Sequence, residues 1–207
     1  MADLFISYSR HDLAFVRRLA AGLEGRGKDV WVDLDDILPS APWMAEIREA
    51  IAEADVVVVV LSPSSVASPV CETELQAAVD LNKRLIPVVA QPTPIAEVPA
   101  ILAALNFLDF CHETADSAFE AALSRLIDVL DTDLDAVHQH TRLLLRTTEW
   151  KDSSHDPARL LRGRQLSEAE AWLAQQGDRT PAPTSGQVGR PTDGSCQQGP
   201  RAVRHVG

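Results

Sequence analysis

The sequence predicts an α/β fold in which helices cover both faces of a doubly wound parallel sheet. Short apolar runs alternate with amphipathic segments over the first 130 residues, which is the pattern of consecutive βα units. One apolar run, residues 56–61, is unbroken and almost entirely β-branched. Such a run is typical of a strand that is buried on both faces, as in a parallel sheet covered by helices.

Five strands are expected. They are the apolar runs at residues 3–8, 29–33, 55–61, 84–90 and 106–110, the last being a short edge strand. A five-stranded parallel sheet of this kind favours the flavodoxin-like strand order 2-1-3-4-5. That order places a ligand crevice between the loops that follow the first and third strands.

Four helices are expected between and after these strands. Apolar residues recur at helical spacing in residues 11–26, 43–53, 71–82 and 116–130. Gly25 and Gly27 close the first helix. Prolines mark the segments 35–42 and 91–99 as loops.

The pattern changes after residue 132, so we divide the chain into three parts. Residues 1–132 form the α/β domain, and residues 133–176 form a helical connector. The connector has a helix that ends near Trp150, a polar linker at 151–157 and a helix at 167–176. Ser167 and Glu170 fit a capping box at the start of that last helix. Residues 177–207 are rich in Pro, Gly, Ser, Thr and Gln and are expected to be a disordered tail.

Composition and charge exclude several classes of protein. The formal net charge is −11, and residues 1–135 hold nine basic and 23 acidic side chains. This acidic surface argues against nucleic acid as a partner. No apolar run approaches the roughly 20 residues of a membrane helix, and no signal peptide is visible. Three scattered cysteines and six scattered histidines show no disulfide framework and no metal-ligand spacing, so we expect no metal site and a cytoplasmic location.

Polar side chains follow the first strand. Ser7, Tyr8, Ser9 and Arg10 stand where the strand's carboxyl end meets the expected crevice. Their hydroxyls and guanidinium can bind a phosphate or a ribose. The alternative is local capping, with Ser9 or Asp12 as a helix N-cap.

Acidic and aromatic side chains follow the second strand. Asp33, Asp35 and Asp36 can coordinate Mg²⁺ or bind ribose hydroxyls, or they are simply a solvated acidic loop. Trp43, at the start of the next helix, can stack on a flat ring or pack in the core.

Two carboxylates stand near the start of the helix after the third strand. Glu72 and Glu74 follow Cys71 closely, and either can be stabilised in its ionised form by the helix dipole. The predicted topology also places this turn across the crevice from Ser9 and Arg10. An ionised carboxylate there can bind a ribose and stabilise positive charge at its anomeric carbon.

Taken together, these segments resemble the TIR (Toll/interleukin-1 receptor) domain in its bacterial form. The resemblance covers roughly residues 1–130. It rests on DLFISYSR at 3–10, VWVD at 30–33, WMAEI at 43–47, ADVVVVVLSP at 54–63, SVAS at 65–68, CETEL at 71–75 and KRLIPV at 83–88.

The resemblance implies two properties. TIR domains self-associate, and the loop at residues 34–42 corresponds to a main contact. Many members also cleave NAD⁺ at the nicotinamide–ribose bond without a further cofactor, and the family's catalytic glutamate corresponds to Glu74. We assign NAD⁺ binding by the same resemblance to Ser9, Arg10, Asp35, Trp43 and Cys71.

Two functions follow as hypotheses. The leading one is a TIR-domain signalling protein of a bacterial immune or stress response that cleaves NAD⁺ when it self-associates. The alternative is a non-catalytic adaptor that acts only through TIR–TIR contacts.

Overall fold

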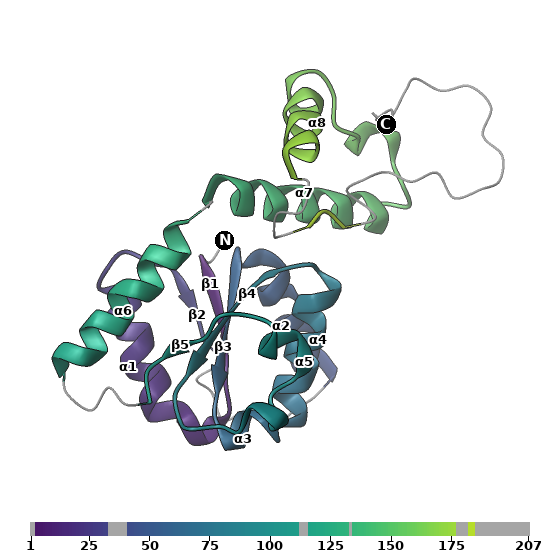
Figure 1. Cartoon of the computed structure of the whole chain (residues 1–207). Helices are drawn as coiled ribbons and strands as arrows, with labels where there is room; N and C mark the ends of the chain where they lie inside the picture. Colours follow the sequence, from purple (N-terminus) through teal and green to yellow (C-terminus); the bar gives the residue numbers. More distant parts are fainter. Residues whose placement is uncertain (1–2, 33–40, 112–115, 133, 177–181, 185–207) are drawn as a thin grey trace.

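A parallel sheet of five strands lies at the centre of the α/β domain (Figure 1). The computed structural model of the 207-residue chain describes residues 3–32, 41–111, 116–132, 134–176 and 182–184, although not the side chains of 41–43, 134 and 175–176. The strands are β1 (Leu4–Ser7), β2 (Val30–Trp31), β3 (Val56–Leu61), β4 (Arg84–Val89) and β5 (Leu108–Asp109). Their order is β2-β1-β3-β4-β5, and all neighbouring pairs are parallel, which confirms the flavodoxin-like prediction.

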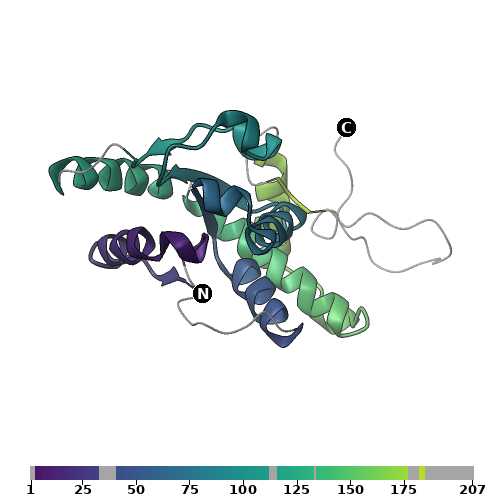
Figure 2. The same cartoon turned by 90° about the horizontal axis from the view of Figure 1, so that it is seen from below.

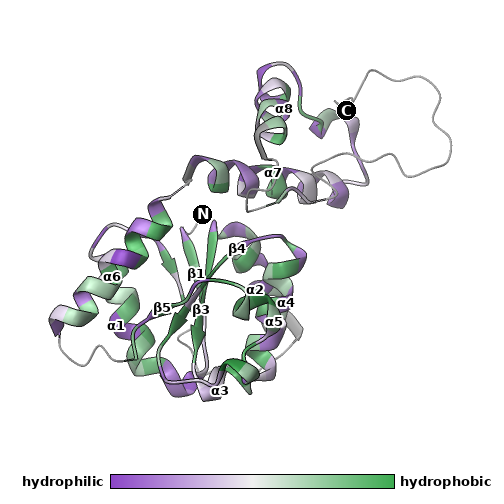
Figure 3. Ribbon diagram, in the orientation of Figure 1, coloured by the Kyte–Doolittle hydropathy of each residue, from purple (hydrophilic) through white to green (hydrophobic). Residues whose placement is uncertain are grey.

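Helices cover both faces of the sheet (Figures 1 and 2). One face carries α1 (Leu13–Glu24) and α6 (Asp116–Asp131). The other carries α2 (Ala41–Glu53), α4 (Pro69–Asp80) and the short α5 (Ala100–Ala103). The strands are therefore mostly hydrophobic, as the colouring of Figure 3 shows, and they contribute apolar side chains to a core on each face.

Alternate residues of β3 supply the two cores. Val56, Val58 and Val60 pack under α1 and α6, whereas Val57, Val59 and Leu61 pack under α2 and α4. Every residue of β3 is buried. This is the two-sided burial that the unbroken apolar run predicts.

Short helical turns account for most departures from the predicted elements. The first helix opens as a 3-10 turn, η1 (Arg10–Asp12), and the segment after β3 forms a one-turn helix, α3 (Pro63–Val66), that the sequence pattern did not reveal. Ser62 and Ser65 form a reciprocal capping box around α3. The loop predicted at 91–99 is confirmed in the main and holds only the 3-10 turn η2 (Ile95–Glu97).

The connector consists of α7 (Leu134–Asp152), the 3-10 turn η3 (Pro157–Arg159) and α8 (Arg164–Gln176). Because α8 begins at Arg164, the predicted capping box at Ser167 is wrong. Ser167 lies within the helix, and its hydroxyl donates to the Gly163 carbonyl at 3.4 Å. The predicted tail, residues 177–207, lies outside the described residues except for 182–184.

Helix α7 packs on the domain and on α8. Val137 is fully buried in the core under α1 and α6. On the other side, Leu143 packs with Ala169 and Trp172 of α8, and the Trp172 indole donates to the Ala136 carbonyl at 3.2 Å. None of the helices within the described ranges combines the length and apolar character needed to cross a membrane.

Candidate functional site

A buried carboxylate lies at the carboxyl end of the sheet. Glu74, on α4, is 5% exposed, and Ser7, the last residue of β1, is 1% exposed. The Ser7 hydroxyl donates to Glu74 Oε2 at 2.6 Å. This contact joins the first strand to α4 at the edge where open parallel sheets bind ligands.

The start of α4 determines which glutamate faces the sheet. Ser68 caps the helix by accepting the Cys71 N–H at 3.3 Å, and Pro69 follows at the first helical position. Cys71, Glu74 and Leu75 then lie on the buried side, whereas Glu72 is exposed. The structure thus separates the two carboxylates that the residue pattern left equivalent.

Cys71 lies one turn before Glu74 and shares its surroundings. Burial raises the pKa of the Cys71 thiol to about 11, and the negative charge of Glu74 acts in the same direction. At neutral pH the thiol is therefore protonated and unreactive. We call Ser7, Cys71 and Glu74 the Glu74 site.

A second polar contact joins three loops at the same edge. Asp12 Oδ2 accepts the Ser62 hydroxyl at 2.5 Å, and Asp12 Oδ1 accepts the Gln91 amide at 2.7 Å. Ser62 and Gln91 follow β3 and β4, so a buried carboxylate holds the loops after three strands together. Asp12 occupies the N-cap position of α1 but makes no side-chain hydrogen bond to that helix, because its carboxylate oxygens bind Ser62 and Gln91.

Of the other predicted binding residues, the structure describes Ser9 and Arg10 in full. Ser9 accepts the His11 N–H at 3.4 Å and caps η1, as its capping alternative expected. Arg10, the first residue of η1, is exposed. Asp35 and most of the loop 34–42 lie outside the described residues, as does the side chain of Trp43.

The local sequence pattern does not identify the main polar contacts. It places Ser7 only among the polar residues at the end of the first strand, and it assigns no role to Ser62 or Gln91. A partial signal exists, because Ser7 and Ser62 are hydroxyl residues at the ends of otherwise apolar strands. Their partners lie 67 and 50 residues away, and no local pattern specifies such pairs.

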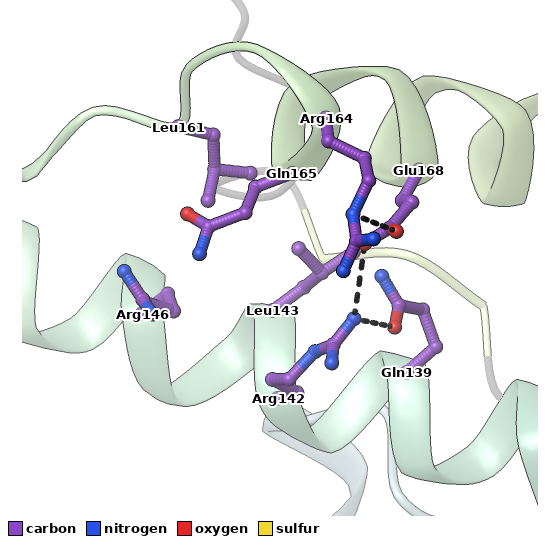
Figure 4. A pocket seen from close by; sticks show the side chains of 8 residues that line it. All are labelled: Gln139, Arg142, Leu143, Arg146, Leu161, Arg164, Gln165 and Glu168. Carbon is purple, nitrogen blue, oxygen red and sulfur yellow. Dashed lines mark hydrogen bonds and ion pairs between the residues drawn. The ribbon is translucent and has the colours of Figure 1, made fainter.

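A pocket of about 140 Å³ lies on the connector, between α7 and α8 (Figure 4). Arg142, Arg146 and Arg164 line it together with Glu168. Glu168 pairs with Arg164 at 3.1 Å and with Arg142 at 3.8 Å. No residue of the Glu74 site lines this pocket.

The fold and the Glu74 site define a flavodoxin-like α/β domain with a buried carboxylate at the carboxyl ends of its strands. A family model of the TIR domain matches residues 4–127. The chain therefore belongs to the TIR domain family, and it is a TIR-domain signalling protein.

Solved structures of TIR domains are similar to this chain. The TIR domain of the Toll-related receptor TRR-2 from Hydra magnipapillata is 29% identical with a TM-score of 0.50, over 62% of this chain and 99% of that one. A metazoan TIR-STING receptor from C. gigas, in complex with 2′,3′-cGAMP, is 23% identical with a TM-score of 0.48. That match covers 60% of this chain and 40% of the receptor. No curated protein matches the chain.

Proposed function

We propose that the chain cleaves NAD⁺ at the nicotinamide–ribose bond, with Glu74 as the catalytic residue. The observation that carries the proposal is the buried Glu74 carboxylate, held by Ser7 at the edge where ligands bind to open parallel sheets. A carboxylate in such surroundings interacts strongly with positive charge, because little water is present to screen it.

The chemistry needs only the carboxylate and water. Glu74 binds the hydroxyls of the nicotinamide ribose. As the bond between C1′ and the nicotinamide nitrogen breaks, nicotinamide leaves with the bonding electrons, and the positive charge developing on the ribose is stabilised by the carboxylate. Water then adds to C1′ and loses a proton, which gives ADP-ribose. Ser7 is a positioning residue, because it acts on the substrate through Glu74.

Self-association is the second part of the proposal. In the sequence, the segment 34–42 lies between β2 and the first turn of α2. The resemblance assigns this loop to TIR–TIR contacts. We therefore expect NAD⁺ cleavage to increase with the concentration of the protein.

One observation favours the alternative function, a non-catalytic adaptor. Glu74 is only 5% exposed, and its bond to Ser7 links two elements of the fold. A carboxylate in that position can be purely structural. Under the catalytic proposal, the edge must open far enough for a ribose to reach Glu74.

An assay of NAD⁺ loss separates the two functions. The full chain is assayed at high concentration with a crowding agent, together with Glu74→Gln and Glu72→Gln. Glu72→Gln is the matched control, because it makes the same change two residues away on the exposed side of α4. Circular dichroism confirms that each variant is folded.

The two functions predict different results. Under the proposal, the wild type and Glu72→Gln consume NAD⁺ equally, whereas Glu74→Gln loses at least about a hundredfold in rate. If the self-associated wild type consumes no NAD⁺, or if folded Glu74→Gln matches it, Glu74 is not catalytic and the adaptor function stands.

A further inference from the structure

A group of ionisable side chains lies at the amino ends of the strands, opposite the Glu74 site. Asp3 precedes β1, Asp55 precedes β3, and His138 lies on α7, which crosses this end of the sheet (Figure 1). Each of the three offers a ligand atom, and these atoms lie within 4.8 Å of one another. His138 Nε2 is 3.1 Å from Asp55 Oδ2.

The buried carboxylate of this group is incompletely bonded. Asp55 is 4% exposed, and its Oδ1 is buried with no hydrogen-bond partner among the described residues. An unpaired buried carboxylate oxygen costs free energy and calls for a partner such as a water molecule or an ion. Burial raises the pKa of Asp55, although the Thr141 hydroxyl and the charges of His138 and Lys83 oppose this.

The nearby ammonium group of Lys83 does not supply that partner. Its Nζ donates to the carbonyls of Ala52 and Ala54 at 2.7 and 2.8 Å and to the Thr141 hydroxyl at 3.3 Å. These three bonds use all the donors of an ammonium group. Lys83 therefore leaves Asp55 Oδ1 without a donor among the described residues.

We propose that Asp3, Asp55 and His138 bind a divalent transition-metal cation, of which Zn²⁺ fits best. One imidazole nitrogen with carboxylate oxygens is a ligand set that Zn²⁺ accepts, whereas Mg²⁺ prefers oxygen alone. Ligand atoms around Zn²⁺ stand about 3 to 3.5 Å apart, so small side-chain movements complete the site. The His138 side chain is 45% exposed, which gives the ion a path from solvent.

A bound ion would connect the connector to the domain. Asp3 and Asp55 directly precede β1 and β3, and His138 belongs to α7. The ion therefore adds three ligand bonds to the packing that already holds α7 in place. Sequence spacing does not reveal the site, because its ligands lie far apart along the chain.

Calorimetric titration of the chelator-treated full chain with Zn²⁺ tests the proposal. The variants are His138→Asn and Asp3→Asn, and the matched control is His155→Asn, an exposed histidine beyond α7. Asp3→Asn keeps an oxygen that can accept the Asp29 N–H, now bonded to Asp3 Oδ2 at 2.8 Å. We expect one Zn²⁺ per wild-type chain, an affinity at least about tenfold weaker in both variants, and no change in the control.

Limited proteolysis of α7 is the second measurement. Zn²⁺ should slow cleavage in the wild type and in His155→Asn but not in His138→Asn. Excess Mg²⁺ should neither protect α7 from cleavage nor displace the bound Zn²⁺. The proposal is overturned if the wild type binds no Zn²⁺ with a Kd below about 1 mM. It is equally overturned if folded His138→Asn binds Zn²⁺ as the wild type does, or if Mg²⁺ competes equally.

Discussion

The Ser7 hydroxyl donates to the Glu74 carboxylate over 2.6 Å, across the contact between the last residue of β1 and the second turn of α4. Both side chains are buried. The bond joins residues 67 positions apart and fixes one carboxylate oxygen at the carboxyl edge of the sheet. Any role of Glu74, catalytic or structural, therefore includes Ser7.

A double-mutant cycle should show this coupling in the stability of the domain. Ser7→Ala, Glu74→Gln and the double variant are unfolded with urea. Because the bond involves a charged acceptor, the two single variants should each lower the free energy of unfolding. The sum of their two losses should exceed the loss in the double variant by about 1 to 3 kcal/mol.

The matched cycle pairs Ser7→Ala with Glu72→Gln. Glu72 is exposed on the same helix, so its coupling energy to Ser7 should stay below about 0.5 kcal/mol. Equal coupling in both cycles would mean that the effect spreads through α4 and does not arise from the Ser7–Glu74 bond.

Cys71 should report on the electrostatics of the Glu74 site. In a Cys111→Ser, Cys196→Ser protein, Cys71 is the single thiol. Burial raises its pKa from 9.0 to about 11, so its thiolate fraction at pH 8 is about a hundredfold lower than that of an unperturbed thiol. Alkylation by iodoacetamide, followed by mass spectrometry, should rise about tenfold per pH unit up to about pH 11.

Glu74→Gln provides the comparison. The variant removes a negative charge that raises the pKa of Cys71, so alkylation at a given pH should become faster. A wild-type rate that levels off below pH 9 would contradict the burial of the thiol.

Lys83 should be important for the stability of the domain. Its buried ammonium donates to the carbonyls of Ala52 and Ala54, which join the end of α2 to the start of β3, and to Thr141 of α7. Lys83→Met leaves these acceptors without their donor and removes the charge that faces Asp55. The free energy of unfolding should fall by about 2 to 4 kcal/mol.

Lys151→Met is the control for this prediction. Lys151 is exposed near the end of α7, and its replacement should change the free energy of unfolding by less than about 0.5 kcal/mol. Similar values for the two variants in thermal or urea unfolding would show that the buried bonds of Lys83 contribute little.

Sequence patterning predicted the sheet well because its strands are buried on both faces. The run at 55–61 matches β3 within one residue, and the run at 84–90 matches β4 equally closely. Of the run at 29–33, only Val30–Trp31 forms a strand. This strand, β2, is half-buried and pairs only with β1. The sequence pattern did not predict helix α3, because four residues are too few to show a hydrophobic period of 3.6 residues.

The site was harder to predict because tertiary contacts define it. Residue types and spacing alone left Glu72 and Glu74 equivalent, and only the family resemblance favoured Glu74. The contact of Asp12 with Ser62 and Gln91 spans 50 and 79 residues, and it forms only when three loops meet. Local patterns carry no information about such pairs.

The two cores on either side of β3 have a further consequence. β3 presents three apolar side chains to each face of the sheet, and five of the six are valine, so its two faces are nearly identical. The difference between the two cores must therefore come from other residues. On one face Phe5 stacks on Trp31 at 4.8 Å, and on the other Gly22 of α1 approaches Leu123 of α6 so closely that a Cβ at Gly22 would lie 2.5 Å from Leu123 Cδ2. The central strand is thus nearly the same on its two faces, and the contacts of Phe5 with Trp31 and of Gly22 with Leu123 make the two cores different.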